Sequence, residues 1–116
     1  MYLLFVVLEN EDLLDEMITG WLDMGISGAT VIETTGALQL ISQHVPIFAG
    51  LRSLTSGGSR HNKTVFAVIE NQELLDLAVG FTENICRQTG KPRQGIYFVT
   101  PVTRFGRLGK DGPPEK

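Results

Sequence analysis

The sequence is short of cysteine and of long hydrophobic runs. Its single cysteine, Cys86, excludes an intramolecular disulfide and suits a reducing compartment. Residues 1–8 are apolar but too few to span a bilayer, and they lack the charged leader and cleavage site of a signal peptide. We therefore expect a cytoplasmic protein in which residues 1–8 form a buried strand and Cys86 is a small core residue on a helix.

Acidic residues are missing from two long stretches. Residues 36–63 contain no Asp or Glu but carry Arg52, Arg60 and Lys63, and residues 86–110 are also free of acids. The formal net charge of −3 argues against general binding to nucleic acid. If the fold brings the two stretches together, they form a local anion site, whereas the plainer alternative is that their bases only solvate the surface.

What the sequence does contain is an internal repeat. Residues 5–15, FVVLENEDLLD, parallel residues 66–76, FAVIENQELLD. Each copy is an apolar strand that leads into a helix. Asn10 and Asn71 are the expected N-caps, because an asparagine side chain can accept a hydrogen bond from an otherwise unpaired backbone N–H.

Apolar residues recur at three- and four-residue spacing after each cap, which predicts two amphipathic helices. The first stripe comprises Leu13, Leu14, Met17, Ile18, Trp21 and Leu22, and the second comprises Leu74, Ala78, Phe81 and Ile85. Gly25 and Gly90 are expected to end the two helices. Strands are predicted to follow at residues 29–34 and 95–99.

The predicted order is βαβ, a long loop, and βαβ. This order is typical of a ferredoxin-like α+β sandwich, in which two helices cover one face of a four-stranded antiparallel sheet. We predict one domain over residues 1–108, a long loop over residues 36–63 between the second and third strands, and a flexible tail over residues 109–116. Connections usually have about 4 to 6 residues, so a loop this long is expected to be functional.

The predicted strands are apolar on both faces. Residues 3–8, LLFVVL, and residues 65–69, VFAVI, contain no polar side chain. Because the helices can cover only one face of the sheet, we expect the other face to be buried against further copies in a cyclic homo-oligomer.

A glycine-rich turn is the main candidate for an anion site. Residues 89–95, TGKPRQG, join the second helix to the last strand and combine two glycines with Lys91 and Arg93. Such a turn can direct backbone N–H groups at a phosphate while the two side chains supply charge. The plainer alternative is a helix C-cap with solvating bases.

The sequence resembles the nitrogen-regulatory PII signal-transduction family over nearly the whole of residues 1–108. Residues 25–36, GISGATVIETTG, look like the end of that family's first helix and the strand that leads into its long loop. Residues 89–91 resemble the start of the family's phosphate-contacting turn. Arg104 and Arg107 lie where the family places C-terminal basic residues.

The resemblance implies a homotrimer that binds ATP, ADP, AMP or a cyclic nucleotide in clefts between subunits. It would signal to a target protein, such as a membrane transporter or a metabolic enzyme, through residues 36–63. The ligand-binding residues implied in this way are Gly36, Ala37, Leu38, Gln39, Lys63, Thr89, Gly90, Lys91, Arg93, Gly95, Arg104 and Arg107. The chain departs from the family pattern at residues 37–39 and at Ile96, where the family has a lysine, so we expect a divergent member.

Two other functions are open at this stage. The only histidines, His44 and His61, lie in the long loop, and a trimer could bind a metal ion through histidines of symmetry-related loops. A small ferredoxin-like enzyme is the third hypothesis. The sequence shows neither an acid/base pair, nor a nucleophile with a neighbouring base, nor a GxGxxG or Walker-type loop, so we do not expect an enzyme.

Overall fold

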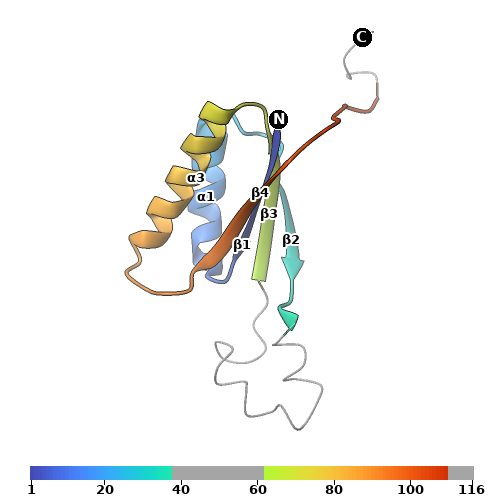
Figure 1. The fold of residues 1–116 in the computed structure, drawn as a ribbon. Coiled ribbons are helices and arrows are strands. Elements are labelled where there is room, and N and C mark those ends of the chain that lie inside the picture. Colours follow the sequence, from blue (N-terminus) through green and yellow to red (C-terminus); the bar gives the residue numbers. More distant parts are fainter. Residues whose placement is uncertain (38–61, 110–116) are drawn as a thin grey trace.

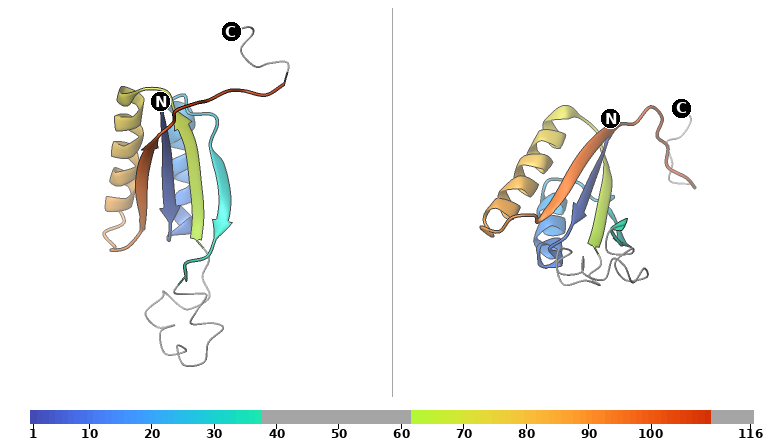
Figure 2. Two further views of the ribbon diagram at one scale, coloured as in Figure 1. Left: turned by 45° about the vertical axis from the view of Figure 1, so that its right-hand side comes forward. Right: turned by 60° about the horizontal axis from the view of Figure 1, so that its bottom comes forward.

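The computed structural model of the protein describes residues 1–37 and 62–109. Its elements are β1 (Tyr2–Leu8), the 3-10 helix η1 (Glu11–Leu13), α1 (Leu14–Asp23), β2 (Thr30–Thr34), β3 (Asn62–Ile69), α3 (Gln72–Arg87) and β4 (Gly95–Pro101). The strands form one antiparallel sheet in the order β2-β3-β1-β4. Helices α1 and α3 lie side by side on one face of this sheet (Figures 1 and 2). The predicted ferredoxin-like α+β sandwich is confirmed.

Both predicted asparagine caps are confirmed. Asn10 Oδ1 accepts from the backbone N–H of Asp12 at 3.0 Å, and Asn71 Oδ1 accepts from that of Leu74 at 2.9 Å. After α1 and α3 the chain turns at Gly25 and Gly90, whose φ angles of 95° and 70° are in the left-handed region that glycine adopts easily.

The core lies between the sheet and the two helices. Alternate residues of β1, namely Leu4, Val6 and Leu8, are at most 2% exposed, and Trp21 of α1 is fully buried against them. The indole Nε1 of Trp21 donates to Thr82 Oγ1 at 3.1 Å, and that hydroxyl donates to the carbonyl of Ala78 at 2.7 Å. The buried polar groups at the α1–α3 contact are therefore paired.

The apolar stripes of the two helices were predicted only in part. Leu13, Met17, Trp21, Ala78 and Ile85 are buried as expected, together with Leu75 and Thr82. Leu22 is 53% exposed, and Leu74 and Phe81 are only half-buried. The ring of Phe81 packs directly over Gly20, where a Cβ atom would collide with it, so this ring fills the gap between the helices instead of facing the sheet.

Two strand boundaries differ from the prediction. Strand β3 begins at Asn62, inside the predicted loop 36–63, because Lys63 is in register with Glu33 of β2 and its Nζ lies 3.8 Å from Glu33 Oε2. Strand β4 continues beyond the predicted end at Val99 to Pro101, which pairs with Tyr2. Proline is tolerated there because β4 is an edge strand.

The face of the sheet opposite the helices, which we call the open face, is apolar. The register places Phe66, Phe5 and Phe98 in one row across β3, β1 and β4, and their ring centroids are 5.4 and 4.8 Å apart. Phe98 is 48% and Ile96 62% exposed. Within residues 1–37 and 62–109, no helix or strand covers this face, as the left view of Figure 2 shows.

Candidate functional site

The turn that follows α3 is held by its own hydrogen bonds. The backbone N–H groups of Thr89 and Gly90 donate to the carbonyls of Cys86 and Arg87 at the end of α3. The N–H of Lys91 donates to Thr89 Oγ1 at 3.1 Å. Local bonds at the end of α3 therefore account for these three N–H groups, which leaves none of the three to bind an anion.

The same turn is anchored to the chain after β1 through Gln94. The carbonyl of Gln94 accepts from the backbone N–H groups of Glu9 and Asn10, and its Oε1 accepts from Asn10 Nδ2 at 2.7 Å. The next residue, Gly95, lies so close to β1 that a Cβ atom would collide with the carbonyl oxygen of Val7. This close approach explains the second glycine of the turn, and it fixes the start of β4 beside Leu8.

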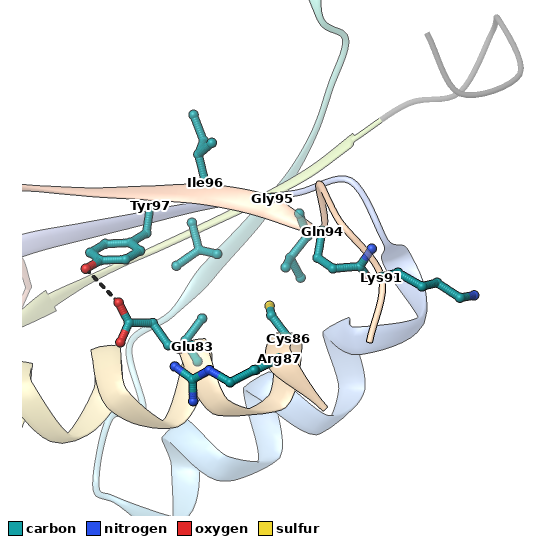
Figure 3. Close-up of a pocket in the computed structure, with 11 residues that line it drawn as sticks. Glu83, Cys86, Arg87, Lys91, Gln94, Gly95, Ile96 and Tyr97 are labelled. Atoms are coloured by element: carbon teal, nitrogen blue, oxygen red, sulfur yellow. Dashed lines mark hydrogen bonds between the residues drawn. The ribbon is translucent and has the colours of Figure 1, made fainter. Parts of the chain in front are cut away.

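A cavity of about 360 Å³ lies beside this turn, between α3 and β4 (Figure 3). Its wall on the helix side consists of Thr82, Glu83, Cys86 and Arg87, the turn adds Lys91 and Gln94, β4 adds Gly95, Ile96 and Tyr97, and its floor is Val6 and Leu8 of β1. We call this space the α3–β4 cavity. It combines an apolar floor with two cationic side chains in its lining, Arg87 and Lys91.

A hydrogen bond joins the two walls of the α3–β4 cavity. The hydroxyl of Tyr97 donates to Glu83 Oε2 at 3.0 Å (Figure 3). This bond, followed by the negative charge of Glu83, raises the pKa of Tyr97 above its ordinary value. The phenol of Tyr97 is therefore protonated around neutral pH and can donate the hydrogen bond to Glu83.

Cys86 was predicted to be a small core residue, and the structure places it half-buried at the edge of the core, with its side chain lining the α3–β4 cavity. Burial raises the pKa of its thiol. A thiol kept in its protonated form is a weak nucleophile, and this arrangement gives Cys86 no catalytic activation.

The predicted ligand-binding residues fall into separate groups. Lys63 and Gly95 both pair with Leu8, so they flank it at one end of the sheet, and the turn of Thr89, Gly90 and Lys91 lies at that end too. Gly36 and Ala37 follow β2, which is the edge strand opposite β4. Leu38 and Gln39, together with His44 and His61 of the metal hypothesis, lie outside the described residues.

The C-terminal arginines lie away from the turn. Arg104 and Arg107 follow the far end of β4, at the end of the sheet opposite the α3–β4 turn (Figure 1). The guanidinium of Arg107 is 5.3 Å from the centre of the Phe105 ring and lines a second cavity of about 230 Å³ with Glu70. A single subunit therefore does not bring Arg104 and Arg107 to the other predicted residues.

Several residues of the α3–β4 cavity were missed from the sequence. Glu83, Cys86 and Arg87 are three and four residues apart and so lie on one side of α3 as it leads into the turn. Their spacing was the feature of the sequence from which these three residues could have been predicted as one group. No feature of the sequence indicated Tyr97, because its bond to Glu83 depends on how β4 packs against α3.

Neither a metal centre nor a membrane span emerges from the described part of the chain. No group of three or more His, Cys, Asp or Glu side chains is placed there to hold a metal ion. None of the described helices has the length and apolarity needed to cross a membrane.

Comparison of the sequence with models of known protein families gives no match, and no curated protein matches it.

Proposed function

We propose that the protein is a trimeric, non-enzymatic PII-like regulator that binds a small anionic effector, an adenine nucleotide, and signals through residues 36–63. The observation that carries this proposal is the row of residues Lys63, Leu8 and Gly95 across β3, β1 and β4. Neighbouring strands are about 4.8 Å apart, so the backbone that enters β3 from the long loop lies roughly 10 Å from the start of β4.

This proximity supports a coupling between effector and loop. A nucleotide that contacts the turn of residues 89–95 and also the ends of the long loop binds one arrangement of that loop more tightly than others. A ligand shifts a conformational equilibrium by its difference in affinity for the two states. The target protein, a membrane transporter or a metabolic enzyme, then recognises the loop in one of its states.

The open face supports assembly into a trimer. Exposed aromatic and branched residues such as Phe98 and Ile96 form a contiguous apolar surface, and such surfaces mark sites of protein contact. Assembly also bears on the effector site. Arg104 and Arg107 lie far from the turn of their own subunit, so they contribute to a nucleotide site only when a neighbouring subunit supplies them.

Calorimetric titration with ATP, ADP, AMP and cyclic nucleotides tests the proposal directly. We expect saturable binding of at least one of them to protein whose trimeric mass has been established by light scattering. Absence of binding by all of these nucleotides, with protein shown to be folded by circular dichroism, contradicts nucleotide sensing. A stable monomer at micromolar concentration contradicts the intersubunit site.

Limited digestion with trypsin tests signalling through the loop. Arg52 and Arg60 are the tryptic sites between residues 36 and 61. We expect the bound nucleotide to change the rate of cleavage after these arginines severalfold, measured by mass spectrometry. Equal cleavage rates at saturating nucleotide would separate nucleotide binding from loop signalling.

A further inference from the structure

We propose that the α3–β4 cavity is a second small-molecule site, contained within one subunit, for an organic anion with one phosphate or carboxylate group and a flat apolar body. It goes beyond the intersubunit nucleotide site proposed above. Its volume of about 360 Å³ is at the lower end of the range of about 300–1,000 Å³ for ligand pockets, which suits a small ligand.

Arg87 is the residue that we assign to bind the anionic group of the ligand. Glu83 and Arg87 are four residues apart on α3, a spacing at which such residues often form an ion pair. Here the Glu83 carboxylate instead accepts from Tyr97, and the ion pair that the described residues form is between Lys63 and Glu33. Within that part of the chain, the Arg87 guanidinium has no hydrogen-bond or ion-pair partner. A guanidinium binds phosphate and carboxylate groups with two parallel hydrogen bonds.

Lys91 adds a second positive charge at the rim. Figure 3 shows its side chain extending outwards from the turn, whereas Arg87 runs back along α3 towards Glu83. Lys91 is therefore expected to attract the anion, and Arg87 to bind it. Glu83 is the single carboxylate that lines the cavity, and its Oε2 accepts the hydrogen bond from Tyr97.

The apolar body of the ligand is assigned to the space between the Tyr97 ring and the floor of the α3–β4 cavity. Val6 and Leu8 are 2% and 0% exposed, and they close the bottom of the cavity. Gln94 is fixed by Asn10, so the wall next to the turn is already in place before a ligand binds. Preformed walls lower the entropic cost of binding, and an aromatic ring favours a flat partner.

Cys86 provides a specific reporter of occupancy, because it lines the cavity and is the only cysteine of the chain. The rate of its alkylation by iodoacetamide is measured by mass spectrometry with phenyl phosphate, benzoate, inorganic phosphate or benzyl alcohol present. We expect phenyl phosphate or benzoate, at ten times its dissociation constant, to slow alkylation roughly tenfold by mass action. Inorganic phosphate lacks the apolar body and benzyl alcohol lacks the charge, so both should protect Cys86 less at equal concentration.

Charge variants locate the anionic group. R87Q should weaken the protection by phenyl phosphate about tenfold or more, since it removes a charge-assisted pair, and K91Q should weaken it less. R93Q is the matched control, because it removes the same charge from the neighbouring turn at a residue that does not line the cavity. The site is refuted if no aromatic anion protects Cys86, or if R93Q weakens protection as much as R87Q.

An assembly-deficient variant separates this site from the intersubunit one. Phe98 lies on the open face and does not line the cavity, so F98S protein that remains folded should retain protection of Cys86 by phenyl phosphate. Loss of protection in folded F98S would contradict a site within one subunit and would indicate that the ligand binds at the interface between subunits. Protection of Cys86 without any nucleotide binding would support the cavity and contradict the nucleotide proposal alone.

Discussion

The two faces of the sheet have similar composition but different surroundings. In β1, Leu4, Val6 and Leu8 face the helices and are at most 2% exposed, whereas their neighbours Phe5 and Val7 point to the open face. On that face Phe98 is 48% exposed. The uninterrupted apolar run of β1 therefore supplies side chains to two faces, of which the described part of the chain buries only the one that faces the helices.

The largest loss of stability is expected from a substitution on the face of the sheet that packs against the helices. L4A removes a fully buried side chain of the core cluster that includes Trp21 and should lower the free energy of unfolding by about 2–5 kcal/mol. Denaturant unfolding monitored by tryptophan fluorescence measures this loss, which should not depend on protein concentration. A loss below about 1 kcal/mol would show that the helix face is loosely packed.

The open face should respond differently. F98S is expected to lower the mass measured by light scattering to that of the monomer while leaving the circular dichroism spectrum unchanged, because Phe98 lies on the face that the proposed trimer buries and is 48% exposed in one subunit. V99T is the matched control, since Val99 is the next residue of β4, pairs with Leu4 and points to the helix side. An unchanged mass for F98S would mean that the open face is not the contact between subunits.

Two threonine hydroxyls, Thr82 of α3 on the helix side of the sheet and Thr64 of β3, should differ in their contribution to stability. T82V leaves the buried Trp21 Nε1 without its acceptor and should cost about 1–3 kcal/mol of stability. T64V removes the 2.9 Å bond between the hydroxyls of Thr34 and Thr64, but Thr34 still donates to the carbonyl of Asn62, so the cost should stay below about 1 kcal/mol. Chemical denaturation of both variants under one set of conditions gives the two losses in the free energy of unfolding. Equal losses for T82V and T64V would contradict this ranking.

The smallest effect concerns pH at the edge of the helix face. The bond to Glu83 raises the pKa of Tyr97 above 10.0, so the neutral phenol is favoured in the folded state. Its contribution to stability is fully present below pH 10.0 and is lost as the pH rises through the raised pKa. Titration followed by the ultraviolet absorbance of tyrosinate should show the Tyr97 pKa falling back towards 10.0 in E83Q. The Y97F variant identifies which of the two tyrosines gives the signal.

Local features of the fold were predictable from the sequence. The repeat of residues 5–15 in residues 66–76 gave the element order, and Asn10 and Asn71 cap helices as expected because capping depends only on nearby backbone groups. Long-range features were not. The burial of Thr82 depends on Trp21 of the other helix, and the start of β3 depends on the register of Lys63 with Glu33.

The candidate site shows the same division. The turn of residues 89–95 could be predicted because glycines and basic residues are adjacent in the sequence. The α3–β4 cavity could not, since Tyr97 meets Glu83 only after β4 has paired with β1. The sequence placed Arg104 and Arg107 with the turn by family resemblance, and the fold of one chain puts them at the opposite end of the sheet.

The pairing of Thr34 with Asn62 joins β2 and β3 as neighbouring antiparallel strands, so positions 35–61 form an insertion in a hairpin. The ends of such an insertion are held by the sheet whatever its length. Doubling the length of a flexible loop costs only about 0.6 kcal/mol. Evolution or a protein engineer can therefore exchange the sequence of this segment while the scaffold keeps its stability.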